Sequence, residues 1–141
     1  MDAFPLDVHS GGQGSQSMAR LLRKGSGWRL GWDPTGQHFV ALVGGETWAL
    51  ELTREEWQTF VQGVQQLQQD MAAMASQLMA EENVTLERSL PLLTLIATGN
   101  STAWSLYIQL HQGRRGEGFW SAQIVPELCQ ALAHWQEQQQ S

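Results

Sequence analysis

Cysteine is nearly absent from the sequence, and Cys129 is the one thiol among 141 residues. A single thiol excludes a disulfide within the chain and any metal cluster built on several cysteines. It is typical of proteins in a reducing compartment, so we expect a cytoplasmic location. The four histidines are dispersed along the chain without the spacing of metal ligands. We therefore expect the protein to work without a metal or another cofactor.

Long hydrophobic runs are also missing, although hydrophobic residues make up 42% of the chain. No run approaches the roughly 18 residues that a membrane-spanning helix needs, and residues 1–17 lack the apolar centre of a signal peptide. Glycine, serine and glutamine are abundant in that opening segment, which predicts a disordered tail. The remaining residues, 18–141, contain enough apolar material for one domain with a hydrophobic core.

Basic residues are scarce, with 8 lysines and arginines against 14 acids and a net charge of -6. Proteins that bind nucleic acid through general attraction to phosphate usually have the opposite balance. The chain has neither a phosphate-binding loop ending in Gly-Lys-Ser/Thr nor a Gly-x-Ser-x-Gly nucleophile turn. The acidic pairs Glu55–Glu56 and Glu81–Glu82 have no evident catalytic partner. We therefore expect a protein that is not an enzyme and does not enter a membrane.

Alternation of apolar and polar residues is the strongest pattern in the chain, and it predicts β-strands. Trp28, Leu30 and Trp32 alternate with other residues, and an Asp-Pro-Thr-Gly turn over residues 33–36 follows them. The pair Gly44–Gly45 indicates a tight hairpin between two further strands. In this first part of the domain we predict four strands, over residues 18–23, 28–32, 39–43 and 47–52.

The period changes at Thr53, where a long helix is predicted to begin. Thr53 and Glu56 have the spacing of a capping box, in which each side chain bonds the backbone N–H of the other residue. Apolar residues then recur every three or four positions from Trp57 to Leu78, as one stripe of an amphipathic helix. A helix over residues 54–82 would be on the order of 43 Å long at about 1.5 Å per residue.

The alternation returns after this helix and repeats the same order of elements. We predict strands over residues 84–89, 92–98, 104–111 and 117–121, and then a shorter helix near residues 124–138. Four strands and a helix therefore occur twice, over about residues 18–82 and 83–141. The pattern predicts an α+β fold of duplicated β4α units, in which antiparallel sheets pack against one long and one shorter helix.

This order of elements resembles the fold of the Whirly proteins, which are single-stranded-DNA-binding transcriptional regulators. In sequence, the segments GWRLGWDP (27–34) and GRRGEG (113–118), the latter followed by Trp120, resemble an uncharacterised cyanobacterial family of unknown function. That resemblance covers about residues 18–135. It implies a Whirly-like fold in a cytoplasmic cyanobacterial protein, and it implies no established activity or functional residues. By analogy of fold, the ligand would be single-stranded DNA.

Six of the eight basic residues lie in two groups near predicted turns. One group lies on the first two strands and comprises Arg20, Arg23, Lys24 and Arg29. The other is Arg114 with Arg115, between two glycines. Guanidinium groups and free backbone amides suit a phosphate or a carboxylate, so both groups are candidate anion or nucleic-acid contacts. Both are also compatible with a solvated strand edge and a polar hairpin that pairs with acidic neighbours.

Most of the seven tryptophans fall on the apolar positions of their predicted elements, which favours burial in the core. Trp120 lies in a short strand beside the second arginine group and is open to two interpretations, a core residue or a platform for a stacked base. Two functions remain. The first is a regulator that binds single-stranded nucleic acid through a basic sheet face, and the second is a protein-interaction or assembly factor that docks through tryptophan and methionine.

Overall fold

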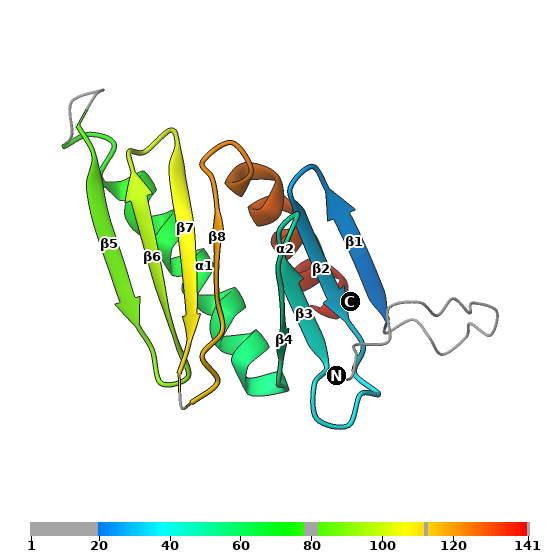
Figure 1. The fold of residues 1–141 in the computed structure, drawn as a ribbon. Helices are drawn as coiled ribbons and strands as arrows, with labels where there is room; N and C mark the ends of the chain where they lie inside the picture. Colours follow the sequence, from blue (N-terminus) through cyan, green and yellow to red (C-terminus); the bar gives the residue numbers. More distant parts are fainter. Residues whose placement is uncertain (1–19, 78–81, 112, 141) are drawn as a thin grey trace.

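The computed structural model describes residues 20–77, 82–111 and 113–140, which form eight strands and two helices. The first unit contains β1 (Leu21–Gly25), β2 (Trp28–Trp32), β3 (Ala41–Gly44), β4 (Ala49–Leu52) and α1 (Arg54–Ala73). The second contains β5 (Val84–Ser89), β6 (Leu93–Gly99), β7 (Trp104–Leu110), β8 (Glu117–Trp120) and α2 (Val125–Gln140). The predicted α+β fold of two β4α units is confirmed (Figure 1). The predicted tail over residues 1–17 lies outside the described residues.

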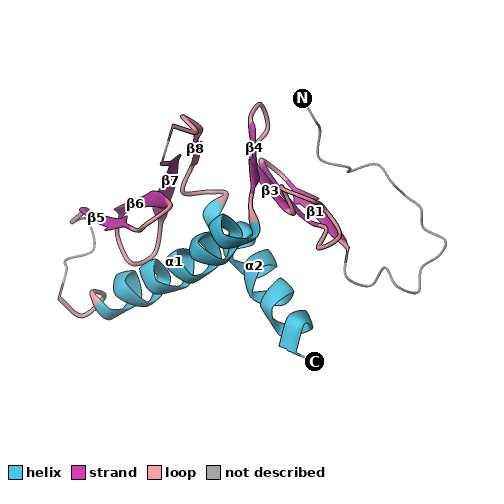
Figure 2. Ribbon diagram, turned by 90° about the horizontal axis from the view of Figure 1, so that it is seen from below, coloured by secondary structure: helices cyan, strands magenta, loops and turns pink. Residues whose placement is uncertain are grey.

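Each unit folds its four strands into one antiparallel sheet with the strands in sequence order. Figure 1 shows β4 of the first sheet next to β8 of the second, with β1 and β5 at the far edges. Both sheets lie on the same side of the helices (Figure 2). Helix α1 packs mainly against β6, whereas α2 contacts β2 and β7 and so bridges the two sheets. The core therefore lies between the sheets and the two helices.

Helix α1 begins as the sequence predicts, because both halves of the capping box form. The N–H of Glu56 donates to Thr53 Oγ1 at 3.1 Å, and the N–H of Thr53 donates to Glu56 Oε1 at 2.9 Å. These bonds satisfy donors that the first helical turn leaves free. The buried stripe of the helix comprises Trp57, Phe60, Val61, Val64, Leu67 and Met71.

The end of α1 corrects the sequence prediction, which extended the helix to residue 82. The helix ends at Ala73, and residues 74–77 form turns. The N–H groups of Met74 and Gln77 bond carbonyls only three residues earlier, as in a tighter 3₁₀ turn. Exposed alanines on both sides of Met74 give the segment no apolar face to bury. Among the described helices, none has the length and apolar composition to cross a membrane.

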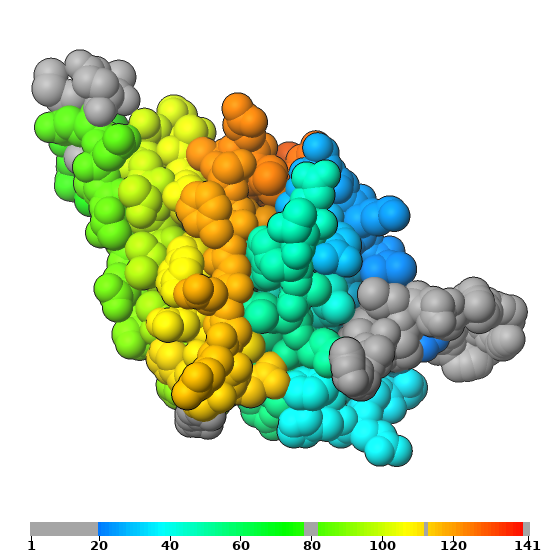
Figure 3. Space-filling view, viewed as in Figure 1, coloured from blue at the N-terminus to red at the C-terminus, as the bar shows by residue number. Residues whose placement is uncertain are grey.

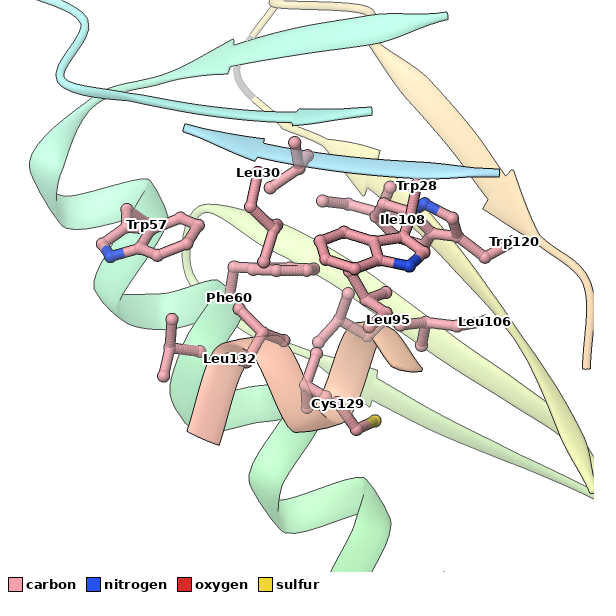
Figure 4. Close-up of a cluster of buried hydrophobic side chains, with 14 of the residues drawn as sticks. Trp28, Leu30, Trp57, Phe60, Leu95, Leu106, Ile108, Trp120, Cys129 and Leu132 are labelled. Atoms are coloured by element: carbon pink, nitrogen blue, oxygen red, sulfur yellow. The ribbon is translucent and has the colours of Figure 1, made fainter. Parts of the chain in front are cut away.

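Tryptophan supplies much of the core, as the alternation predicts. Figure 4 shows side chains of both sheets and both helices meeting in this core, among them Leu30, Trp57 and Leu132. Trp57 stacks on Trp32 with ring centroids 5.9 Å apart, and it meets Trp135 of α2 edge-on at 5.1 Å. The predicted burial of Trp28, Trp32, Trp57 and Trp104 is confirmed, whereas Trp48 is only partly buried against the core.

The pairing of the strands defines an outer face for each sheet, on the side away from the helices. Figure 3 shows these outer faces side by side. The outer face of the second sheet carries Thr85, Glu87, Ser89, Thr94, Ile96, Thr98, Ser105, Tyr107, Gln109, Glu117 and Phe119. The residues next to them along each strand point toward the helices. The period of two therefore gives each strand one face toward the core and one face away from it.

Candidate binding groove

The basic residues do not gather on one face. β1 is the far edge of the first sheet, and β2, β3 and β4 separate it from β8. Arg23 pairs in register with the inward-facing Leu30, whereas its neighbour Lys24 pairs with Arg29 and lies on the opposite side. The arginine pair 114–115 lies in the β7–β8 loop, in the other half of the molecule. The continuous basic face that the nucleic-acid hypothesis requires is therefore missing from the described residues.

Half of these six cations, Arg20, Arg29 and Arg114, already bind groups of the protein itself. Arg20 pairs with the buried Asp33 at 2.9 Å. Arg114 donates to the carbonyl oxygen of Glu51 and, at 3.2 Å, to the carboxylate of Glu56, and its guanidinium lies 4.7 Å from the ring centroid of Phe39. These contacts fasten the β7–β8 loop of the second unit to the start of α1 in the first. The predicted anion contact at Arg114 is therefore an internal ion pair.

Two further arginines are also engaged. Arg54 donates to the carbonyl of Pro34 at 3.3 Å and lies 5.4 Å from the ring centroid of Trp32, and Arg88 pairs with Asp70 of α1 at 2.6 Å. Arg23, Lys24 and Arg115 are the cations of the described chain that have no such partner.

The position of Trp120 decides between the two interpretations of this residue, as part of the core or as a platform for a stacked base, and it excludes the second. Its side chain is fully buried, with 0% exposed. The indole N–H donates to the carbonyl of Gly44 at 2.9 Å, and the ring packs on Trp48 with centroids 4.9 Å apart. Trp120 therefore joins β8 to the β3–β4 hairpin across the line where the two sheets meet, and it offers no surface to a ligand.

A groove of about 610 Å³ opens at this junction, between the tip of the β3–β4 hairpin and β8. We call it the hairpin groove. The residues that line it include Glu46, Trp48, Tyr107, Glu117 and Phe119. Phe119 is 54% exposed and is one of two large hydrophobic residues of the described chain that face solvent. The other is Leu22 on β1, which does not line this groove.

The hairpin wall of the groove is held rigidly by Arg29. Its Nε donates to the carbonyl of Gly45 at 3.0 Å, and its Nη2 donates to the carbonyl of Trp48 at 2.9 Å. The ring of Trp48 then lies over Gly118 of β8, where an added Cβ would come within 2.2 Å of the ring. Only glycine leaves room for this contact. Arg29 therefore shapes the groove instead of offering its charge to an outside anion.

The β8 wall of the groove is ordered by a hydrogen bond between the side chains of Tyr107 and Glu117. Tyr107 and Phe119 are direct cross-strand neighbours on the outer face. The hydroxyl of Tyr107 donates to Glu117 Oε1 at 2.6 Å. This hydrogen bond raises the pKa of Tyr107 above its ordinary value, with smaller contributions from burial and from the charge of Glu117. The carboxylate of Glu117 is thus held in place at the rim of the groove.

Comparison with known proteins places this chain in a family. A family model described as a domain of unknown function, DUF1818, matches residues 23–135. The chain belongs to the DUF1818 family. A crystal structure of a protein of unknown function from Prochlorococcus sp. NATL2A, described as a member of the DUF155 family, is 30% identical. The match covers 81% of this chain and 97% of that protein, with a TM-score of 0.76. No curated protein matches the sequence.

A second hollow of about 400 Å³ lies between α1, α2 and the β6–β7 turn. Met71, Trp104 and Cys129 line it, together with small and uncharged polar residues. Burial raises the pKa of Cys129 to about 12, so its thiol keeps its proton at neutral pH and is a poor nucleophile. Within the described residues, no three histidine, cysteine or acidic side chains are placed to hold a metal ion.

The sequence analysis missed the hairpin groove, although part of its signal was visible. Tyr107 and Phe119 occupy the solvent-facing phase of their strands, next to inward-facing Ile108 and Trp120. Exposed aromatic residues on the solvent-facing side of a sheet indicate a surface that a binding partner covers. The position of Glu46 beside them could not be read from the sequence, because it depends on how the two sheets meet.

Proposed function

We propose that this protein is a non-enzymatic binding module whose hairpin groove holds a segment of a partner protein. The observation that carries the proposal is Phe119, which is 54% exposed beside a groove whose walls are fixed by Arg29 and Tyr107. Exposed aromatic residues next to preformed concave surfaces are typical of protein-binding sites. Binding would cover the apolar ring and recover the free energy that its exposure costs.

The distribution of charge supports a protein partner over single-stranded nucleic acid. The outer face of the second sheet carries Glu87 and Glu117 and no lysine or arginine. A phosphate backbone laid across this face would meet two carboxylates with no cation to offset them. The single-stranded DNA hypothesis keeps one supporting feature, because Tyr107 and Phe119 form an open aromatic pair on which bases could stack.

The groove residues also favour binding over catalysis. The hydroxyl of Tyr107 is protonated at neutral pH and donates that proton to Glu117, and its raised pKa makes it a still weaker acid. A carboxylate that acts as a general base must be free to accept a proton from the reacting group. Glu117 instead accepts the hydrogen bond of Tyr107, which holds it at the rim of the groove. We therefore assign the acidic groups of the groove to recognition.

The proposal is tested by photo-crosslinking from the groove. A benzophenone amino acid replaces Phe119 in one variant and Leu22 in a control, and both are expressed in a cyanobacterium. We expect a dominant protein adduct from position 119 that position 22 does not give. The identified partner is then purified, and Phe119→Ser should weaken its complex at least tenfold, whereas Leu22→Ser should change it less than twofold. Equal adducts from both positions, or equal effects of both serine variants, would refute the proposal.

A further inference from the structure

The hairpin groove is acidic as well as aromatic. Glu46 of the hairpin and Glu117 of β8 both line it, and both residues are exposed. Among the described residues that line the groove, none is a lysine or an arginine. Arg29 is absent from the lining, and it donates to the carbonyls of Gly45 and Trp48 in the hairpin wall. Two carboxylates against the single charge of Arg29 leave an excess of negative charge around the groove, which favours a cation over an anion as its occupant.

The two kinds of wall suit one chemical group. Two carboxylates can accept hydrogen bonds from a guanidinium or an ammonium group, and the faces of Tyr107 and Phe119 attract a cation through the negative charge of their π-systems. Glu117 is held by the 2.6 Å bond from Tyr107, so less of its freedom is lost when it binds a cation. A planar guanidinium can both stack on a ring and bond a carboxylate, which favours arginine over lysine.

Apolar surface continues from the groove along the outer face. Tyr107 is the cross-strand neighbour of Phe119 on one side and of Ile96 on the other. Ile96 is partly exposed, so an apolar strip crosses three strands beside the acidic groove. An occupant with only a charge would leave this strip in water. The surface therefore fits a segment in which an apolar side chain accompanies the cation.

We propose that the hairpin groove recognises an arginine, or less tightly a lysine, that a partner polypeptide presents next to an apolar residue. The cation lies between Glu46 and Glu117, and the apolar residue covers Phe119 and Tyr107. This inference rests on the proposed function and specifies the chemistry of the partner segment.

A peptide-display selection on the full-length protein tests the inference. A random-peptide library is selected against the wild type, and we expect enriched peptides to contain arginine beside an aromatic or aliphatic residue. One enriched peptide and its Arg→Gln counterpart are then labelled and titrated by fluorescence anisotropy. The arginine should strengthen binding to the wild type at least fivefold. In the Glu117→Gln variant, the arginine should strengthen binding less than twofold. In the Glu55→Gln variant, which removes a distant charge, the fivefold preference for the arginine peptide should remain.

The remaining outcomes separate the two proposals. If Phe119→Ser abolishes binding while Glu117→Gln leaves the arginine preference unchanged, the groove binds proteins and the cation inference is wrong. If Phe119→Ser binds the peptides as the wild type does, or if nothing is enriched above protein-free resin, both proposals fail. Acidic or purely apolar enriched peptides also overturn the inference. A labelled single-stranded oligonucleotide that saturates the protein and is lost in Phe119→Ser would replace a protein partner with nucleic acid.

Discussion

The two β4α units repeat one plan on their inner faces and diverge on their outer faces. In β2, Trp28, Leu30 and Trp32 point toward the helices, and the same phase of β7 supplies Trp104, Leu106 and Ile108. On the outer side, the first sheet carries Leu22, Lys24, Arg29 and Glu51. The second sheet carries aromatic and acidic residues and no base. Burial constrains the inner positions to a common pattern, whereas the outer positions are free to differ.

The contrast indicates where a specific surface could develop. A duplicated architecture keeps its period of apolar residues because every inward side chain fills space in a shared core. The outer faces are not constrained by that packing, so their residues can differ between the two units. The hairpin groove lies where the edge strands of the two sheets, β4 and β8, approach each other. It uses the hairpin of the first unit and the aromatic face of the second, and neither unit contains it alone.

Breaking the shared core should have the largest effect. Trp57 contacts Trp32 of the first sheet and Trp135 of α2, so it joins the two units. Its side chain is 1% exposed. Trp57→Ala should lower the free energy of unfolding by about 3–5 kcal/mol, from lost burial and the cavity left behind. Urea unfolding followed by circular dichroism measures this loss. As a control, Leu22→Ala on the outer face should change the free energy of unfolding by less than about 0.5 kcal/mol. A loss below about 1 kcal/mol in Trp57→Ala would contradict the burial of Trp57 in the core.

The arginine pair of the β7–β8 loop gives a sharper comparison between neighbouring residues. Arg114→Ala removes the bonds to Glu51 and to the buried Glu56, which should cost about 2 kcal/mol of unfolding free energy because an acceptor loses its charged donor. Arg115 is exposed and without a partner in the described structure, so Arg115→Ala should change stability by less than about 0.5 kcal/mol. Thermal and urea unfolding of both variants provide the measurement. Equal losses would show that Arg114 does not fasten the loop to α1.

Sequence reasoning succeeded where a local rule decides the structure. The change of period at Thr53 located the start of α1, because the capping box depends on residues three apart. The predicted end of α1 was wrong by several residues. The apolar spacing in the sequence continues past Ala73, but the helix does not. The roles of Arg114 and Trp120 could not be predicted, since their partners Glu56 and Gly44 lie more than fifty residues away in the sequence.

The groove was beyond prediction for the same reason, although its aromatic half was accessible. Alternation places Phe119 on the solvent phase of its strand without any further information. Which residues lie opposite it depends on the meeting of two sheets that share no hydrogen-bonded strands in the described chain. Long-range assembly thus determines the site, whereas local pattern determines the elements that build it.

Titration of the one tyrosine in the chain tests the order of the β8 wall. The bond to Glu117 raises the pKa of Tyr107 above its usual 10.0, so Glu117→Gln should lower that pKa toward the ordinary value. Absorbance at 295 nm against pH measures it directly, with Glu55→Gln as a control that should not shift the curve. The bond stabilises the fold fully below the ordinary pKa, and this contribution is lost as pH rises through the raised value. An unchanged curve in Glu117→Gln would mean that the rim is not ordered as described.

The smallest effect is expected in a test of the unpartnered basic residues as a nucleic-acid surface. Lys24 and Arg115 are free but lie in different halves of the molecule, and the net charge is -6. We therefore expect no saturable anisotropy change when a labelled single-stranded oligonucleotide at low salt is titrated with protein to high micromolar concentration. A real phosphate interface would behave differently, because binding would weaken steeply with salt and the Lys24→Ala, Arg115→Ala double variant would flatten the slope by about 1–2 units. Saturable binding with that response would return the basic residues to the functional surface. Salt-insensitive binding that Phe119→Ser abolishes would instead place base stacking on the second sheet.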